Sequence, residues 1–289
     1  MADAQLRVVI SAATAGLASG LAGAQRQLSN FGNQARNAGL ALSVGLAAPL
    51  VGLAVSAVKA AIDFESSFAG IRKTVDATED QFAALSSGMR KMATQIPVNV
   101  NELNRIGQAA GQLGIRTENI LKFTRVIADL GVATNLSSEQ GATALARFAN
   151  IVQMPQENFD RFGSTIVDLG NNLATTEAEI VEMSLRLAGA GAQIGLTEAQ
   201  MLGFAGALSS VGIEAQAGGT AISRVFVALA QTVASGGKDL RGFAKVAGMS
   251  SAQFKTAFQK DAAGAIIAFV EGLGRMSASG ENVFAVLDA

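Results

Sequence analysis

The residue types that most often perform enzyme chemistry are missing from this sequence. Its 289 residues include no Cys, no His, no Trp and no Tyr. Without Cys or His, a Ser-His-Asp or Cys-His nucleophilic centre cannot form, and the usual ligands of zinc, copper and haem are lacking. Disulfides are excluded for the same reason. Any acid–base chemistry would therefore have to use carboxylates or lysines alone.

Carboxylates do cluster in the sequence, but at places where helices are expected to begin. Negative charge at a helix N-terminus complements the helix dipole, which explains these clusters without catalysis. The clusters are Glu79-Asp80, Glu157 with Asp160, Glu177 with Glu179 and Glu182, and Glu198. A carboxylate hydrolase stays as an alternative, and it would require a cleft with paired acids that the sequence does not locate.

The glycine-rich segments do not match nucleotide-binding motifs. Residues 107–114 contain three glycines but follow no strand, and Gly236-Gly237-Lys238 lacks the spacing of a Walker A loop. The sequence therefore predicts no catalytic residues, no metal site and no cofactor, and we expect the protein not to be an enzyme.

The composition points to association with other surfaces. Hydrophobic residues make up 49% of the chain and charged residues only 16%, against about 25% in ordinary soluble domains. So low a charge predicts that part of the surface is covered by other chains or by lipid. The formal net charge of -1 argues against a dedicated nucleic-acid-binding protein.

The N-terminal region is expected to be an extended arm followed by a long helical segment. Residues 1–13 form the arm, in which the β-branched run Val8-Val9-Ile10 also permits a short strand. Residues 14–75 form the helical segment, whose first part has apolar residues at heptad spacing. This seam indicates either an amphipathic helix packed on its own domain or a helix that meets copies of itself or a partner. The candidate self-association residues are Leu17, Leu21, Leu28 and Phe31.

An uncharged run of 22 residues lies between Arg36 and Lys59. As a helix it would be about 33 Å long, close to the thickness of the hydrocarbon core of a bilayer. Three alternatives stay open: a buried or self-associating helix, a helix that inserts into a membrane conditionally, and a permanent membrane span. The candidate membrane or packing residues are Leu40, Leu42, Leu46, Pro49, Leu50, Val51, Leu53, Val55 and Val58.

The remainder of the chain, residues 76–289, is predicted to be a compact domain of about ten helices, so that the fold class is all-α. Five helix starts are marked by Ser or Thr three residues before Glu or Gln. These pairs are Thr78 with Gln81, Ser137 with Gln140, Thr176 with Glu179, Thr197 with Gln200, and Ser250 with Gln253. Five glycines are expected to end helices. They are Gly114, Gly131, Gly170, Gly195 and Gly212.

A weak internal repeat suggests a helical duplication within this domain. Residues 111–115 align with residues 192–196, and the alignment pairs Arg105 with Arg186. With a small gap it also pairs Arg147 with Arg224. We interpret the similarity as two copies of one helical unit at 94–148 and 175–225, which are expected to pack alike.

Several short motifs occur in an order that resembles the N-terminal region of bacteriophage tail tape measure proteins. They begin with residues 20–24, Phe31-Gly32 and residues 44–50, and continue with Ala61-Ile62-Asp63-Phe64-Glu65 and residues 107–115. Residues 123–126, 189–195, 210–215 and 219–224 follow in the expected order. The family-like positions are Phe64, Glu65, Gly107, Gly111, Gly114, Gly195, Gly212, Thr220 and Arg224.

The resemblance implies a structural virion protein and not an enzyme. Proteins of this family lie in the lumen of the tail tube as several parallel copies, and their length sets the length of the tail. The resemblance implies as partners other copies of the chain, tail tube and tail-tip proteins, and tail assembly chaperones, with no specific nucleic acid. It also implies a location in the host cytoplasm during assembly and in the virion tail lumen afterwards.

The compact part of this chain is not expected to be the ruler itself. A continuous helix of 289 residues would be at most about 430 Å long, and turns after residue 75 fold the chain back. We therefore expect the ruler downstream of Ala289, with this sequence as part of a longer protein. The alternative function is a membrane-active helical protein that inserts residues 37–58 into the host envelope during DNA ejection.

Overall fold

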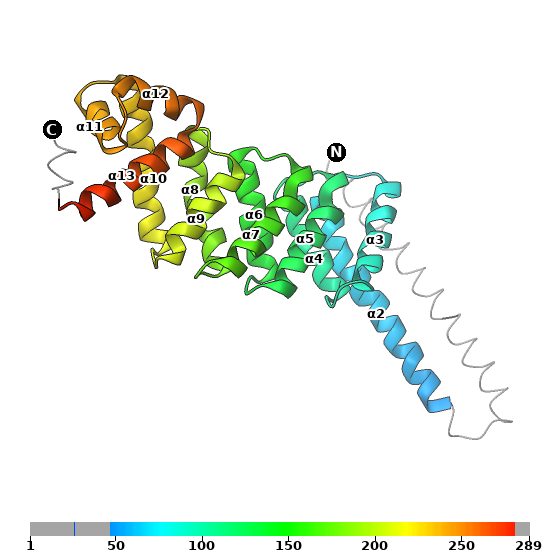
Figure 1. The fold of residues 1–289 in the computed structure, drawn as a ribbon. Helices are drawn as coiled ribbons and strands as arrows, with labels where there is room; N and C mark the ends of the chain where they lie inside the picture. Colours follow the sequence, from blue (N-terminus) through cyan, green and yellow to red (C-terminus); the bar gives the residue numbers. More distant parts are fainter. Residues whose placement is uncertain (1–25, 27–46, 281–289) are drawn as a thin grey trace, which may run out of the picture. The chain divides into compact units, whose positions relative to one another are not determined.

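The computed structural model describes Arg26 and residues 47–280. All regular structure in this part of the chain is helical, which confirms the all-α prediction (Figure 1). The α-helices are α2 (Ala47–Thr74), α3 (Glu79–Ala93), α4 (Val100–Gln112), α5 (Ile120–Ala133), α6 (Ser138–Val152), α7 (Phe159–Asn172), α8 (Glu177–Gln193), α9 (Glu198–Ser210), α10 (Ala215–Ser235), α11 (Lys238–Val246), α12 (Ser251–Lys260) and α13 (Ala262–Ala278). Short 3₁₀ turns at Thr117–Asn119 and Gln156–Asn158 precede α5 and α7. The predicted arm with its optional strand lies outside the described residues.

All five predicted Ser and Thr caps are confirmed. The side chain of each capping residue accepts a hydrogen bond from the backbone N–H three residues on, at the start of α3, α6, α8, α9 and α12. Four of the five are reciprocal capping boxes, in which the Glu or Gln side chain also accepts from the backbone of the cap. Two donors that a helix start leaves unpaired are satisfied in each case.

The glycine predictions are confirmed at three positions and wrong at two. Gly114, Gly195 and Gly212 follow α4, α8 and α9 with φ near +80°, the left-handed conformation that glycine adopts without strain. Gly131 and Gly170 instead lie inside α5 and α7. At Gly170 a Cβ would lie 2.6 Å from the carboxyl carbon of Glu177, the first residue of α8, whose side chain lies over this position.

The chain divides into two compact units, residues 1–63 and residues 64–289. The second unit begins within α2, because Phe64, Phe68, Ile71 and Val75 are buried in its core. It therefore includes residues that the sequence assigned to the N-terminal helical segment. The predicted boundaries at 13/14 and 75/76 stay predictions.

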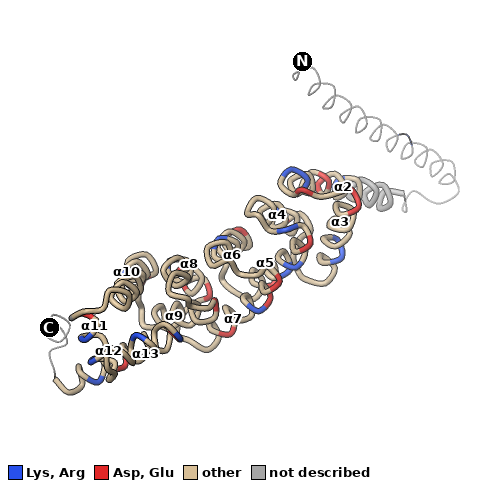
Figure 2. Tube along the Cα trace, turned by 90° about the horizontal axis from the view of Figure 1, so that it is seen from above, with Lys and Arg blue, Asp and Glu red and all other residues tan. Residues whose placement is uncertain are grey.

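The second unit consists largely of helices stacked in two layers (Figure 2). Helices α4, α6, α8 and α10 pack side by side in one layer, and α3, α5, α7 and α9 in the other. Helices α11, α12 and α13 pack on one another after α10. In the first layer the helices begin at Val100, Ser138, Glu177 and Ala215, a spacing of 38 or 39 residues. Each helix pair thus adds one similar step to the stack. The predicted duplication of residues 94–148 and 175–225 stays a prediction.

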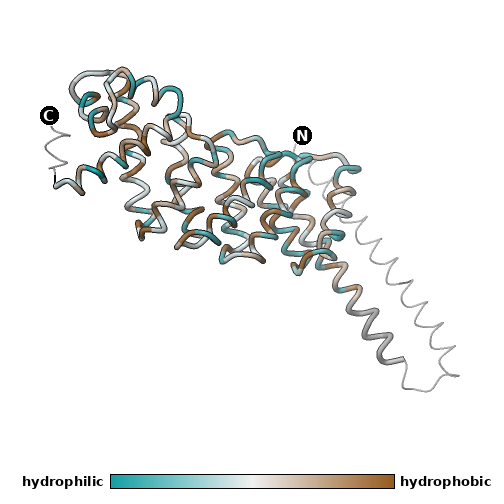
Figure 3. Tube along the Cα trace, viewed as in Figure 1, coloured by the Kyte–Doolittle hydropathy of each residue, from teal (hydrophilic) through white to brown (hydrophobic). Residues whose placement is uncertain are grey.

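Phenylalanine rings pack together in the core, both within one layer and across the two layers. Phe123 of α5 meets Phe159 of α7 edge to face at 4.8 Å between ring centroids. Phe204 of α9 meets Phe226 of α10 at 5.6 Å in the same way. Figure 3 shows that every helix of the stack combines hydrophobic and hydrophilic residues. The buried apolar faces form one continuous core that holds the stack together.

Candidate functional site

The motif at residues 61–65 ties α2 to α3. The guanidinium of Arg90 in α3 lies 4.1 Å from the ring centroid of the buried Phe64, and it forms an ion pair of 3.4 Å with Glu65. A cation over an aromatic face is attracted by the ring quadrupole. Phe64 and Glu65 therefore both bind the side chain of Arg90, which gives these two family-like positions a structural role.

A second set of side-chain contacts joins the end of α2 to the start of α3. Arg72 donates two parallel hydrogen bonds of 2.8 and 2.9 Å to the carboxylate of Glu79, and its guanidinium lies 4.6 Å from the ring centroid of Phe82. The hydrogen bonds from Arg72 lower the pKa of Glu79, and the same bonds raise the pKa of Arg72. Both groups are thereby held in their charged forms.

The glycines of the segment 107–114 allow α4 to lie close to α2. A Cβ at Gly107 would lie 2.9 Å from Cδ1 of Ile71, and a Cβ at Gly111 would lie 2.9 Å from the backbone oxygen of Thr74. At this contact the hydroxyl of Thr74 donates a hydrogen bond of 3.1 Å to the backbone oxygen of Gln108. The segment is a helix-packing motif in this structure.

The family-like positions near α10 have different surroundings. Thr220 is exposed, and its hydroxyl donates to the backbone oxygen of Gln216 one turn earlier. Arg224 is exposed one turn further along the same helix. Gly195 and Gly212 occupy the turns after α8 and α9, as Gly114 does after α4. The structure does not bring these positions together into one site.

Of two other sets of predicted residues, one lies outside the described residues and the other is placed in part. Leu17, Leu21, Leu28 and Phe31 of the self-association seam lie outside the described residues. Leu40, Leu42 and Leu46 of the uncharged run also lie outside them. Helix α2 begins at Ala47 and includes the remainder of the uncharged run. Val58, the last residue of the run, is 39% exposed. Whether this helix meets protein or lipid stays a prediction.

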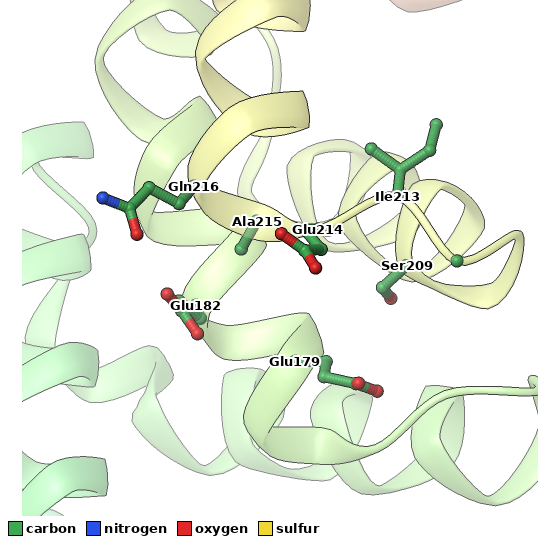
Figure 4. Close-up of a pocket in the computed structure, with 8 residues that line it drawn as sticks. Glu179, Glu182, Ser209, Ile213, Glu214, Ala215 and Gln216 are labelled. Carbon is green, nitrogen blue, oxygen red and sulfur yellow. The ribbon is translucent and has the colours of Figure 1, made fainter.

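An acidic hollow of about 290 Å³ lies where α8 meets the turn between α9 and α10. Its lining includes Glu179, Glu182 and Glu214, whose carboxylates come from separate points on α8 and on the turn before α10 (Figure 4). Hydrogen bonds from the backbone N–H of Thr176 and from the hydroxyls of Thr175 and Thr176 lower the pKa of Glu179. A general acid needs the opposite shift, so Glu179 is a capping residue in its ionised form.

A more open groove of about 420 Å³ runs between α5 and α7. Its floor is apolar, with Val126, Leu130 and Val167. The acids at its rim have partners: Asp129 forms an ion pair of 2.8 Å with Arg125, and Asp160 one of 3.3 Å with Lys122. The backbone N–H of Arg161 is the main cause of the lowered pKa of Asp160. The groove thus resembles a contact surface more than a reaction centre.

Within the described part of the chain, no group of three or more Asp and Glu side chains could hold a metal ion. One described helix, α10, is long and apolar enough to cross a membrane by length and composition. It packs on α8, with Gly219 against Arg186 and Met183, and 28% of its apolar window is buried. One such helix is weak evidence for a membrane span.

Sequence comparison gives two matches. The model of a family described as phage-related minor tail protein matches residues 86–286, more than half of the chain. The "Probable tape measure protein" of Halomonas phage phiHAP-1 is 22% identical over 196 residues, which cover 63% of this chain. The aligned part spans only 23% of the length of that relative. No solved structure matches the chain.

Proposed function

The chain belongs to the family of phage-related minor tail proteins, and from this membership we propose that it is part of a tape measure protein. In this role it lies in the lumen of the tail tube and takes part in setting tail length. The observation that carries the proposal is the similarity to a probable tape measure protein over 63% of the chain. Membership of the family itself supports a structural role in a phage tail.

The stacked helices suit a folded scaffold better than an extended ruler. Each helix pair occupies 38 or 39 residues but advances the stack by one helix spacing, about 10 Å. The same residues in one continuous helix would span about 58 Å. We therefore assign attachment and assembly to the compact unit, and length measurement to more extended segments of the polypeptide.

The proposed partners are the proteins that a tape measure protein would contact during tail assembly and in the finished tail. They comprise parallel copies of the same chain, tail tube and tail-tip proteins, and assembly chaperones in the host cytoplasm. The exposed surfaces of the stack provide room for such contacts, because only one face of each helix is used by the core. Support of genome delivery at infection belongs to the same proposal.

A gene deletion tests the length-setting role. We expect a phage that lacks the gene to assemble no tails, or tails of variable length, and the intact gene supplied in trans to restore a single length, as measured by electron microscopy. Antibodies against residues 64–280 should label the tail only after its tube has been opened. Tails of normal number and length without the gene would overturn the proposal.

A second candidate function is membrane insertion of residues 37–58 during DNA ejection. It is favoured by helix α2, which contains the second part of the uncharged run and continues beyond it without a break. The helix is exposed just after the run, where Ile62 is 51% exposed. Dye release from anionic lipid vesicles by the complete chain tests it. Leu46→Glu or Val51→Glu should abolish the release, because a charge near the centre of a span is costly. Val211→Glu is the matched control, since Val211 is 73% exposed in a turn elsewhere. Equal effects of all three changes would exclude insertion of this run.

A further inference from the structure

Each helix of the α4–α6–α8–α10 layer contains one basic residue, and that residue is an exposed arginine. The four are Arg105, Arg147, Arg186 and Arg224. Within the described part of the chain, none of them forms an ion pair, and no guanidinium among them donates a hydrogen bond to a protein group. We call these four residues the arginine row.

The repeated geometry of the layer puts these arginines in register. A helix of the other layer (α5, α7 or α9) connects each of the four helices to the next, so the four run in the same direction. Arg147, Arg186 and Arg224 are each the tenth residue of their helix. Arg105 is the sixth residue of α4, one turn nearer the N-terminus and on the same face.

Contacts between α8 and α10 fix the spacing at one end of the row. A Cβ at Gly219 of α10 would lie 2.7 Å from Cβ of Arg186, so the arginine side chain begins in the seam between the two helices. Ser223, the neighbour of Arg224, donates a hydrogen bond of 2.9 Å to the backbone oxygen of Arg186. With helix axes about 8–10 Å apart, the row places one guanidinium roughly every 10 Å.

Three cations of the other layer are paired within the protein, in contrast to the arginine row, whereas Lys91 and Arg161 of that layer form no ion pair among the described residues. Lys122 pairs with Asp160 at 3.3 Å, Arg125 with Asp129 at 2.8 Å, and Arg90 with Glu65 at 3.4 Å. Unpaired guanidinium groups present planar donors suited to bidentate bonds with a carboxylate or a phosphate. The arginine row is therefore a regular series of anion-binding groups whose own chain does not satisfy them.

We propose that the arginine row binds an acidic α-helix of a partner protein that lies across the layer. A helix rises 1.5 Å per residue, so seven residues cover about 10 Å and return to nearly the same face. Asp or Glu at every seventh position would thus meet successive arginines. Glu102, Glu139, Glu177, Glu179 and Glu182 lie in the same layer, within the first six residues of α4, α6 and α8. They would repel a continuous polyanion such as duplex DNA, but a helix with widely spaced acids avoids them.

Fluorescence anisotropy with the complete chain tests this inference, which does not rest on the length-setting role. The probe is a labelled helical peptide of roughly four heptads with Glu at every seventh position, and the control peptide has Gln there. One variant combines Arg147→Gln, Arg186→Gln and Arg224→Gln. The matched control combines Arg161→Gln, Arg241→Gln and Arg275→Gln, which removes the same charge from exposed positions outside the layer. Circular dichroism checks that both variants keep their helices.

We expect the row variant to bind the acidic peptide at least about tenfold more weakly, and the control variant to change affinity by less than about threefold. Replacing the three row arginines by Glu should restore binding to a peptide with Lys at the seventh positions. Absence of saturable binding by the unaltered chain, or equal loss in both variants, would overturn the proposal. Tighter binding of duplex DNA, lost in the row variant, would reject an acidic helix in favour of nucleic acid.

Discussion

The hydroxyl of Ser223 donates a hydrogen bond of 2.9 Å to the backbone oxygen of Arg186, and so joins α10 to α8. The bond forms because Gly219, one turn earlier in α10, leaves room for the side chain of Arg186. Both features belong to the stretch 219–224, which resembles the tape measure family in sequence. In this structure the stretch serves helix packing and, at Arg224, leaves one cation exposed.

Close helix contact in the C-terminal part predicts opposite effects for two glycines of α13. A Cβ at Gly272 would lie 1.9 Å from the backbone oxygen of Val246, whereas a Cβ at Gly274 would meet nothing within 4 Å. Gly272→Ala should lower the free energy of unfolding by at least about 2 kcal/mol, because backbone cannot move aside cheaply. Gly274→Ala should raise it by about 0.5–1 kcal/mol through helix propensity. Urea denaturation measures both, and equal effects would contradict the contact.

The cap at the start of α8 predicts a pH-dependent contribution to stability. Hydrogen bonds from Thr176 and Thr175 lower the pKa of Glu179 below its ordinary value of 4.5. A lowered pKa in the folded state means that the contribution is fully present well above pH 4.5 and is lost as the pH falls through the lowered value.

Glu179→Gln should therefore destabilise the protein at pH 7, and this difference should shrink as the pH falls below 4.5. Thermal unfolding across this range measures it. Glu182→Gln is the matched control one turn further along α8, since no described residue donates a hydrogen bond to the carboxylate of Glu182. A difference at Glu179 that does not change with pH would show that the carboxylate is not held by the cap.

A buried hydroxyl in α5 predicts a stabilising substitution. Thr124 is fully buried, and its Oγ1 has no hydrogen-bond partner. A buried polar atom without a partner costs free energy, and Val has nearly the same shape without the hydroxyl. Thr124→Val should thus raise the free energy of unfolding by about 1 kcal/mol. Thr124→Ser keeps the hydroxyl and removes the methyl group, so it should be less stable than the original. A loss of stability in the Val variant would indicate a bound water or partner at Oγ1.

Local signals in the sequence predicted much of this fold. Ser and Thr caps marked five helix starts, because a cap uses only residues within one turn. The prediction that Gly131 and Gly170 end helices was wrong. Both lie inside a helix and next to the first residue of the following helix, as Gly170 does to Glu177, and a local pattern does not reveal such a neighbour. The sequence aligned Arg105 with Arg186 but could not place them on one surface. That placement requires the two-layer stack, which follows from contacts between helices far apart in the chain.

The regular step of the stack predicts that one helix pair can be removed without loss of the fold. Deletion of residues 138–176 would put α8 in the place of α6 next to α4. The two helices bury their fourth, fifth, eighth, eleventh and twelfth residues alike, so the core face is kept. The shortened protein should remain helical and unfold in one cooperative transition. Failure to fold would show that the steps are not interchangeable.

The same deletion in the phage distinguishes a folded stack from an extended ruler in the assembled tail. If residues 138–176 stay folded, mean tail length should change by no more than about 10 Å, the width of one helix step. If the stack unwinds into a continuous helix, the deletion of 39 residues should shorten the tail by about 58 Å. Electron microscopy of many tails resolves the two values. The larger change would contradict the assignment of length measurement to other segments, because it would make these residues part of the ruler.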